Sequence, residues 1–399
     1  MELMEQGTAA LVGSNSRKVR NGDQYYPYRQ HSDFFYLTGI NQEESLLLLF
    51  PDHIEAGKRE ILFLRRPSDK HVLWSGPGLS EEEACRLSGI TNIRGREELQ
   101  GVMKGLLGNT HTLYTSGDLP MVRIEELFPE VIPAALAPLT TSLRMVKEEE
   151  ELEAIRRACT ITGAAFRRVL GKLRPGMWEY EIEAEMIAEF IRRGASGHAF
   201  EPIVASGKNA LTLHYTANND RCREGDLVLM DFGAEVHNYA ADCSRTVPVS
   251  GRFTDRQRQV YEAVTRIFKQ AREMMRPGVL MSEFHQQVGE LFQEEHIALG
   301  LYTLKEARES PEEMPLWKNY YMHGTSHSLG LDVHDPCDRN IPFRAGMVLT
   351  CEPAIYLGEE GFGIRVENDI LISDHGPVDL MEEIPMEAGA IEEMIHSNR

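Results

Sequence analysis

Two segments in the second half of the chain each place an acidic residue at the end of a short apolar run. The run G225-D-L-V-L-M-D231 ends at Asp231, and G346-M-V-L-T-C-E352 ends at Glu352 at the same offset from its glycine. A turn-prone segment then leads to a second acid, Asp242 in the first case and Glu367 in the second. Carboxylates at the ends of buried strands are costly unless positive charge neutralises them, and facing carboxylates raise each other's pKa. The four acids therefore predict a bound divalent cation.

Histidines lie near these acids in the sequence. The segment H323-G-T-S-H327 offers two imidazoles, His334 follows it, and His214 lies in L213-H-Y-T upstream of the first pair of acids. A single histidine is more often structural than a ligand, so His327 is predicted as a ligand because of the neighbouring acids. Four carboxylates and one histidine suit two divalent ions that prefer oxygen ligands.

Each of these residues also has an ordinary structural interpretation. Asp231 and Asp242 alone would be turn or edge-strand acids that face water, but a matched pair in a second apolar hairpin requires a common reason. Arg365, two residues before the last acid, is either a surface arginine or a cation that orients a carboxylate or a substrate. Cys243 and Cys351 each flank a proposed ligand, so we predict that they point away from the site as small core residues.

Two ions held in this way indicate hydrolysis of an amide. Ions about 3.5–4 Å apart share a bridging water and lower its pKa, so that one ion polarises a carbonyl while the bridging hydroxide attacks it. A glutamate beside the ions would carry the proton to the leaving nitrogen. We find no Ser–His–Asp set and no loop that cradles phosphate in the sequence. Metal-assisted hydrolysis of a peptide bond is therefore the predicted chemistry.

The composition argues against nucleic-acid and membrane partners. The chain of 399 residues is long enough for two domains, and its 42 basic and 62 acidic residues give a net charge of -20. An acidic balance disfavours binding to nucleic acid or to an anionic membrane surface. Six scattered cysteines without a C-x-x-C pair fit a reducing compartment, and no apolar run approaches the roughly 18 residues of a membrane span. We expect a soluble, cytoplasmic protein.

Residues 1–143 alternate short apolar runs with helical patterns, which predicts an α/β domain. A helix is expected to begin near Ser80, where S80-E-E-E83 forms a capping box, and another is expected over Glu97–Leu107. Residues 134–143 are interpreted as the linker, and the aromatic segment Tyr26–Gly39 is attributed to packing. The candidate strands are Ala9–Val12, Leu46–Phe50, Ile61–Leu64 and Leu113–Tyr114.

Residues 144–399 show one pattern twice, which indicates an internal repeat. A helix that opens at K147-E-E-E-E-L ends at R174-P-G176, a second helix follows, and the first acidic hairpin comes next. In the second half T254-D-R-Q257 caps a helix, R276-P-G278 ends it, and the same order recurs. A repeat of roughly 100 residues suggests a duplicated domain and not a solenoid. Halves related by a pseudo-two-fold axis would place their hairpins side by side, with metal ions between them.

These motifs resemble those of the pita-bread metallopeptidases, family M24, and among them most closely aminopeptidase P. The resemblance implies a catalytic domain of the α+β pita-bread type at 144–399, with an internal pseudo-two-fold repeat, behind an α/β N-terminal domain at 1–143. It extends over nearly the whole chain, from Y26-P-Y-R-Q-H-S-D-F-F-Y-L-T-G39 and W74-S-G to D242-x-x-R-T, H323-G-x-S-H327 and G363-I-R-V-E367. Departures from the usual family residues, which concern the pocket and not the ligands, are Phe232, Ala241, Ser328, Ala354 and H334-D-P-C.

The resemblance also implies a cofactor and residue roles. Two divalent ions are implied, manganese first, with zinc, cobalt or iron as alternatives. Asp231 would hold one ion, His327 and Glu352 the other, and Asp242 and Glu367 would bridge both. Glu352 would also carry the proton. The residues implied to hold the substrate and to orient the ligands are His214, His323, His334 and Arg365.

The implied activity is release of the N-terminal residue from peptides with proline in the second position. A bond to proline has no N–H and proline fixes φ, so a metal site that holds the carbonyl and the ring suits this bond. Prolidase, which cleaves Xaa-Pro dipeptides, is the alternative. A catalytically inactive peptide-binding module is a third hypothesis, which the intact ligand residues disfavour. The family also implies a homo-oligomer, a dimer or a tetramer, in which Asp23 and Trp74 are candidates to shape a neighbouring subunit's active-site mouth.

Overall fold

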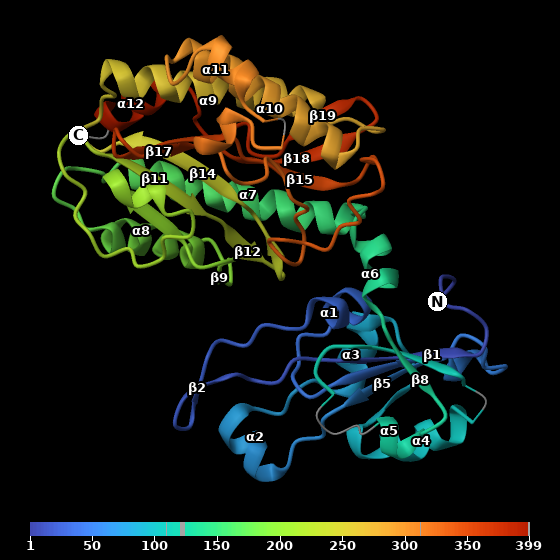
Figure 1. Ribbon diagram of the computed structural model, residues 1–399. Coiled ribbons are helices and arrows are strands. Elements are labelled where there is room, and N and C mark those ends of the chain that lie inside the picture. The colour runs from blue at the N-terminus through green and yellow to red at the C-terminus, as the bar shows by residue number, and fades with distance from the viewer. Residues whose placement is uncertain (109, 120–123, 312, 398–399) are drawn as a thin grey trace. The chain divides into compact units, whose positions relative to one another are not determined.

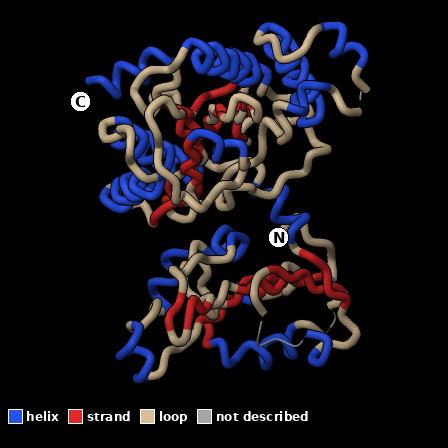
Figure 2. Tube along the Cα trace, turned by 60° about the vertical axis from the view of Figure 1, so that its left-hand side comes forward, coloured by secondary structure: helices blue, strands red, loops and turns tan. Residues whose placement is uncertain are grey.

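The computed structural model describes residues 1–108, 110–119, 124–311 and 313–397. The chain divides into two compact units, Met1–Leu143 and Arg144–Arg399. Each unit has its own strands and helices (Figures 1 and 2). Within the described residues, none of the helices combines the length and the apolar character that crossing a membrane requires.

The first unit is built on a single sheet that has apolar residues on both faces. The strand order is β6-β5-β4-β1-β7-β8, and β1 runs parallel to β7 and antiparallel to β4. Ala9 and Leu11 of β1 pack in one apolar cluster while Ala10 and Val12 pack in the other, because successive side chains point to opposite faces. The sheet is therefore buried on both faces, as in a layered α/β domain. The strands are β1 (Thr8–Gly13), β4 (Leu46–Leu49), β5 (Glu60–Leu64), β6 (Ile93–Gly95), β7 (Thr112–Ser116) and β8 (Ile132–Ala135), with β2 (Val19–Asn21) and β3 (Gln24–Tyr25) in a separate hairpin.

The helices of this unit correct two of the sequence predictions. Residues 134–143 are not a linker, because they end strand β8, which pairs with β7, and then form most of α6, with Leu136 buried between them. The helix predicted over Glu97–Leu107 is divided into a 3-10 turn at Arg96–Glu98 and the helix α4. The capping box predicted at Ser80 is present at the start of α3. The helices are α1 (Ser32–Thr38), α2 (Asp69–Ser75), α3 (Glu81–Ser88), α4 (Leu99–Leu106), α5 (Ile124–Leu127) and α6 (Ala137–Arg144).

The aromatic segment Tyr26–Gly39 is divided between core and surface. Phe34 on α1 is fully buried, as the attribution to packing predicted. Tyr26 is 54% exposed beside the β2–β3 hairpin, so the attribution is wrong for this residue. Trp74 on α2 is also exposed, at 78%. The sequence pattern of aromatic residues therefore did not distinguish core from surface here.

The second unit contains two helix pairs, as the internal repeat predicted. Helix α7 is followed by α8, and α9 by α10, and each pair is connected through an R-P-G segment. Gly176 and Gly278 in these segments have φ values of 89° and 94°, which favour glycine. The capping box predicted for Thr254 and Gln257 is present. The helices are α7 (Glu149–Leu170), α8 (Glu179–Arg192), α9 (Asp255–Met274), α10 (Met281–Ala298), α11 (Leu304–Glu309) and α12 (Ala388–Ser397).

Each helix pair is followed by the same arrangement of strands. Strand β11 pairs with β14 and encloses the β12–β13 pair in sequence, and β15 pairs with β18 and encloses β16–β17. In Figure 1 the strands β11, β14, β15, β17 and β18 lie between α8 on one side and α9 and α10 on the other. Two equivalent hairpins are thus placed at the centre of the unit. The strands are β9 (Gly197–His198), β10 (Ile203–Ser206), β11 (Leu227–Phe232), β12 (Ala234–Val236), β13 (Tyr239–Ala240), β14 (Cys243–Pro248), β15 (Val348–Cys351), β16 (Ala354–Leu357), β17 (Phe362–Arg365), β18 (Asn368–Ser373) and β19 (Gly376–Asp379).

Candidate metal centre

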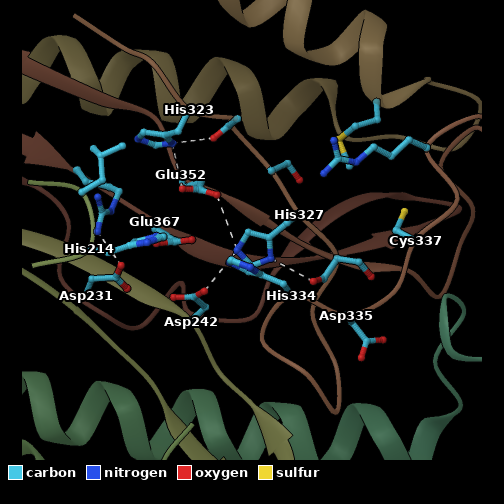
Figure 3. A pocket seen from close by; sticks show the side chains of 17 residues that line it. His214, Asp231, Asp242, His323, His327, His334, Asp335, Cys337, Glu352 and Glu367 are labelled. Atoms are coloured by element: carbon cyan, nitrogen blue, oxygen red, sulfur yellow. Dashed lines mark hydrogen bonds and ion pairs between the residues drawn. The ribbon is translucent and has the colours of Figure 1, made fainter. Parts of the chain in front are cut away.

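A cavity of about 410 Å³ lies in the second unit, and every candidate site residue predicted from the sequence lines it. Figure 3 shows acids and histidines from distant parts of the chain converging there. A cavity of this size is within the range of sites that hold small ligands. The predicted residues in its wall are His214, Asp231, Asp242, His323, His327, His334, Glu352, Arg365 and Glu367.

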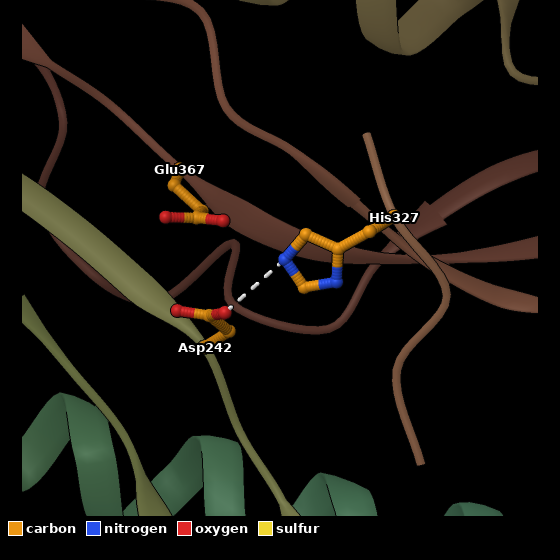
Figure 4. Close-up of side chains that lie close together, drawn as sticks. All are labelled: Asp242, His327 and Glu367. Atoms are coloured by element: carbon orange, nitrogen blue, oxygen red, sulfur yellow. Dashed lines mark ion pairs between the residues drawn. The ribbon is translucent and has the colours of Figure 1, made fainter. Parts of the chain in front are cut away.

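Three of the predicted ligands form a tight cluster. One ligand atom each from Asp242, His327 and Glu367 lies within 4.8 Å of the other two (Figure 4). Asp242 directly precedes β14, Glu367 joins β17 to β18, and His327 lies in the loop before β15. Glu352 follows β15, and its Oε1 is 3.8 Å from His327 Nε2. The cluster therefore takes one acid from each of the two equivalent hairpins.

Backbone hydrogen bonds hold the two hairpins together at the ligands. The N–H of Glu367 donates to the carbonyl oxygen of Ser244 on β14 at 3.0 Å. The N–H of Asp242 donates to Asp369 Oδ2 on β18 at 3.0 Å. Each hairpin thus fixes the backbone of a predicted ligand that the other carries. The positions of the predicted ligands depend on the strands and not only on side-chain rotamers.

His327 presents Nε2 to the acids. Its Nδ1 lies 3.1 Å from the carbonyl oxygen of Ser328, which can only accept, so Nδ1 carries a proton. Nε2 is 3.5 Å from Asp242 Oδ2, and in the neutral ring its lone pair faces the acids. The N–H of His327 donates to Thr350 Oγ1 on β15 at 3.1 Å, which fixes the residue. A ring whose second nitrogen donates to a carbonyl is the usual arrangement of a histidine that ligates a metal.

The acids of the cluster lack sufficient positive charge. Asp242 and Glu367 are 5% and 2% exposed. Burial, followed by the charge of Asp231, raises the pKa of Asp242, and burial, followed by the charge of Asp242, raises the pKa of Glu367. One oxygen of Asp231 and one of Asp242 are buried without a hydrogen-bond partner among the described residues. Buried acceptors without donors, on acids that repel one another, fit a divalent cation.

Arg365 is a cation that the protein itself supplies beside the cluster. It is 4% exposed, so the interpretation as a surface arginine is wrong. Its Nη2 donates to Asp231 Oδ2 at 2.6 Å, its Nη1 to the hydroxyl of Tyr356 at 2.8 Å, and its Nε to Ser244 Oγ at 2.8 Å. Arg365 therefore orients Asp231 from a buried position.

His323 connects Tyr356 to Glu352. Its Nδ1 lies 2.9 Å from the carbonyl oxygen of Gly324 and 3.3 Å from Glu352 Oε2, so Nδ1 carries the proton. Nε2 then accepts from the hydroxyl of Tyr356 at 2.9 Å. Burial acts to raise the pKa of Glu352, but the hydrogen bond from His323, together with nearby positive charge such as that of Arg365, outweighs burial and brings this pKa below its usual value. An ionised carboxylate at the cavity can accept a proton.

His214 and His334 face the cavity from its exposed side. The ring of His334 lies 4.3 Å from that of His327 in an edge-to-face arrangement. Within the described part of the chain, neither side chain makes a hydrogen bond or an ion pair with another residue. Both imidazoles are therefore available to a molecule in the cavity.

Three residues that contact the predicted site were not found from the sequence. Ser244 donates to Glu367 Oε2 at 2.8 Å, Asp369 holds the backbone of a ligand, and Tyr356 joins two predicted residues. Ser244 and Asp369 each lie two positions after a predicted ligand, and Tyr356 lies four positions after another. Even spacing on a strand places side chains on one face, so this alternation was a usable signal. The cavity wall also includes Met281, Cys337 and Arg339.

The cysteines beside the ligands belong to the core, as predicted. Cys243 and Cys351 are both 0% exposed. All six cysteines of the chain are free thiols. The site is thus built from oxygen and nitrogen donors, without a thiolate in the cluster.

Comparison with known proteins identifies the family of this chain. The model of metallopeptidase family M24 matches residues 153–374, and that of the aminopeptidase P N-terminal domain matches residues 1–114. The chain belongs to metallopeptidase family M24. Both the predicted family and the predicted fold are confirmed, with an aminopeptidase P N-terminal domain followed by an M24 pita-bread catalytic domain.

Relatives of this M24 chain are similar over its whole length. An Xaa-Pro aminopeptidase of Haemophilus influenzae is 34% identical over 98% of this chain and 94% of its own. The structure of a putative aminopeptidase P from Bacillus anthracis has a TM-score of 0.91 at 31% identity, covering 100% of this chain and 96% of the other. Aminopeptidase P from E. coli, solved with the inhibitor Pro-Leu, has a TM-score of 0.90 at 32% identity, with the same coverage. The M24 chain is therefore a hydrolase of the Xaa-Pro aminopeptidase type.

Proposed function

We propose that this M24 hydrolase removes the N-terminal residue from peptides that have proline in the second position. The observation that carries the proposal is the cluster of Asp242, His327 and Glu367 at a cavity that further histidines line. A metal centre beside a cavity of small-peptide size suits hydrolysis of a peptide bond. Similarity to Xaa-Pro aminopeptidases over nearly the whole chain supports the substrate class.

The centre is proposed to hold two divalent ions. Asp231 would hold one ion, His327 and Glu352 the other, and Asp242 and Glu367 would bridge both. The convergence of these side chains on one cavity and the unpartnered buried oxygens support these roles. When bound, the ions supply Lewis acidity and lower the pKa of water between them. We propose manganese, with zinc, cobalt or iron as alternatives, because carboxylate ligands suit manganese and metal availability decides among them.

The protein's own residues would orient the peptide and move the proton. Glu352 is proposed to accept a proton in the cavity and to pass it to the leaving nitrogen of proline, because its carboxylate lines the cavity and contacts His323. His214 and His334 are proposed to contact the peptide, because both imidazoles line the cavity and neither makes a hydrogen bond or an ion pair with another described residue. Arg365 is proposed to hold Asp231 in the orientation that a ligand requires.

Proline in the second position restricts how the site can bind the substrate. The nitrogen of the cleaved bond carries no hydrogen, so the enzyme cannot hold the substrate through that N–H. The leaving nitrogen must also receive a proton, which we propose that Glu352 delivers. The inhibitor in the E. coli aminopeptidase P structure, Pro-Leu, begins with proline. We therefore propose that the proline ring binds in the cavity beside the cluster of Asp242, His327 and Glu367.

The test compares peptides of different length and sequence. Manganese-loaded protein is incubated with Xaa-Pro-Yaa tripeptides, Xaa-Ala-Yaa tripeptides and Xaa-Pro dipeptides, and released amino acid is quantified by chromatography. We expect cleavage of the Xaa-Pro-Yaa tripeptides only. Dipeptides cleaved and tripeptides spared would instead identify a prolidase. Absence of metal-dependent hydrolysis in a folded, metal-loaded protein would identify an inactive peptide-binding module.

We further propose a cytoplasmic homo-oligomer, a dimer or a tetramer. The six free thiols support a reducing compartment. On α2, Leu73 and Trp74 are 83% and 78% exposed, which supports contact with another subunit. Light scattering coupled to size-exclusion chromatography measures the mass directly, and a monomeric mass at micromolar concentration would contradict the oligomer.

A further inference from the structure

Glu179 is a buried carboxylate that is neutralised by hydrogen-bond donors and not by a cation. It is the first residue of α8 and is 0% exposed. Oε1 accepts from the N–H and the hydroxyl of Ser206, both at 2.7 Å, and from Asn209 Nδ2 at 3.0 Å. Oε2 accepts from the hydroxyl of Tyr215 and from the N–H of Asp220, both at 2.8 Å. No lysine, arginine or histidine in the described residues forms an ion pair with it.

All of these donors belong to one segment of the chain, 206–220, which carries His214. Ser206 ends β10, and Asp220 lies at the far end of the segment, directly before the bridge that Arg221 makes to Trp178. Tyr215 is the neighbour of His214 in the sequence. The beginning, the middle and the end of the segment are therefore held at a single carboxylate.

A second acid of the same helix holds the segment at another point. Asn218 is buried and has a φ of 43°, which an L-residue rarely adopts. Its Nδ2 donates to Glu183 Oε2 at 2.9 Å, one turn after Glu179 on α8, and its Oδ1 accepts from the N–H of Val204 at 2.9 Å. Helix α8 thus fixes the path of the segment on both sides of His214.

His214 itself has little else to hold it. Its side chain is exposed and makes no hydrogen bond to another described residue, although it lines the cavity. Its position consequently depends on the backbone of its own segment. Because Glu179 collects the donors of that segment, a change at Glu179 would move His214 relative to the metal cluster.

We propose that Glu179 is a positioning residue that holds His214 at the catalytic cavity. The inference rests on the proposed function, since it assigns the placement of one residue of that site. Glu179 lies outside the cavity wall and acts only through the segment that it anchors. A carboxylate is needed because both of its oxygens face donors, and an amide nitrogen in place of either oxygen would face an N–H or O–H donor.

The test is a double-mutant cycle of Glu179→Gln with His214→Ala. We expect Glu179→Gln alone to lower kcat/KM on an Xaa-Pro tripeptide by about 10-fold to 100-fold, the range of a small misplacement of a functional group. In the His214→Ala background the same change should cost less than about 2-fold, because the residue that it positions is absent. An equal loss in both backgrounds would overturn the inference while leaving the proposed function intact.

Glu151→Gln is the matched control. Glu151 is also a buried glutamate in the first turn of a helix, at 8% exposure, but its donors are the N–H of Glu148 and the hydroxyl of Tyr239, away from the His214 segment. We expect its kcat/KM to equal that of the unchanged protein. Tyr215→Phe, which removes one donor only, provides a milder variant if Glu179→Gln does not fold, and the same cycle with His214→Ala applies to it.

A spectroscopic measurement separates this inference from the activity. In zinc-loaded, histidine-labelled full-length protein, the imidazole resonances of His214 are assigned by their loss in His214→Ala. We expect Glu179→Gln to shift or broaden them and Glu151→Gln to leave them unchanged. Unchanged His214 resonances in Glu179→Gln would overturn the inference. The unchanged protein could be inactive on every Xaa-Pro peptide while the resonances respond as expected. That result would contradict the proposed function but would still support the positioning of His214 by Glu179.

Discussion

Buried carboxylates in the second unit are neutralised in two different ways. Asp335 has its own cations, since Arg144 Nη2 donates to it at 2.6 Å and Lys147 Nζ at 3.2 Å, and the side chains of Asp335 and Lys147 are each 1% exposed. Asp242 and Glu367 are equally buried, yet neither forms an ion pair with a lysine or arginine among the described residues. The same chemical group therefore sits in two opposite electrostatic situations.

The comparison indicates that Asp335 has a structural role and that Asp242 and Glu367 are suited to binding a cation. A buried ion pair with all its partners in the protein is complete, and breaking it leaves an uncompensated charge. A cluster of buried acids that form no ion pair with a lysine or arginine is incomplete, and it favours binding of a positive ion. Asp335 should therefore stabilise the fold without metal, whereas Asp242 and Glu367 should stabilise it only with metal.

The largest expected effect is on activity. Replacement of Asp242 with Asn removes a proposed ligand of both ions, so we expect kcat/KM to fall by more than about 100-fold, since changes behind a ligand already cost 10-fold to 100-fold. Kinetics on an Xaa-Pro tripeptide and metal analysis of the same sample measure the effect. Glu295→Gln, in a partly exposed ion pair with Arg266 outside the cavity, is the control and should keep full activity. Full activity of Asp242→Asn would remove this acid from the catalytic centre.

The second expected effect is on the free energy of unfolding, and its sign differs between Asp335 and the acid cluster of Asp242 and Glu367. In metal-free protein, Asp335→Asn leaves Lys147 buried without a counter-charge, whereas Arg144 still pairs with Asp332 at 2.7 Å. We expect the substitution to lower the free energy of unfolding by about 3–5 kcal/mol. Asp242→Asn removes one of several repelling charges, so its metal-free stability should be equal or higher. Urea denaturation in a chelator measures both. Equal destabilisation by the two substitutions would mean that the comparison is wrong.

The third prediction concerns how the stability of the metal-free protein and its affinity for metal depend on pH. Burial raises the pKa of Asp369 to about 7, and burial with neighbouring carboxylates raises the pKa values of Asp242 and Glu367. In the folded, metal-free protein these three carboxyl groups keep protons that they release in the unfolded chain above a pH of roughly 4. They therefore lower the free energy of unfolding as the pH rises from about 4 to about 7. Metal binding needs ionised acids and neutral His327, so metal affinity and activity should fall in acid.

Thermal unfolding with and without manganese checks this prediction. The increase in Tm that the metal causes should be larger at about pH 7.5 than at about pH 5. Asp335→Asn, if it folds, should show the same pH trend, because it does not alter the acid cluster. An increase in Tm that is greater in acid would contradict the assignment of the acids.

The smallest effect concerns the hydrogen bonds behind the cluster. Tyr356→Phe removes the donor to His323 and the acceptor of Arg365, while the proposed ligands remain. We expect kcat/KM to fall by about 10-fold with the metal content unchanged. Metal content and kinetics are measured on one preparation, and loss of metal from Tyr356→Phe would show that the residue supports the ligands themselves.

Short-range patterns in the sequence determined much of the second unit. Apolar runs that end in Asp231 and Glu352, capping boxes such as that of Thr254, and the two R-P-G segments all depend on neighbours a few residues apart. Helix and strand periodicities act over the same distance, so the repeat and the list of candidate ligands could be derived from them. The interpretation of residues 134–143 as a linker failed because their place in β8 and α6 depends on pairing with β7, a contact with another strand.

Only the tertiary structure decided which charges meet. The sequence alone named Asp242, His327 and Glu367 as candidates. Their approach to within 4.8 Å requires the two hairpins to be held together, by the hydrogen bonds of Glu367 to β14 and of Asp242 to β18. Neither the pairing of Asp335 with Lys147 nor the five donors around Glu179 follows a local spacing. A hydrogen bond or an ion pair depends on distance in space, and the folded path of the chain sets that distance for residues far apart in sequence.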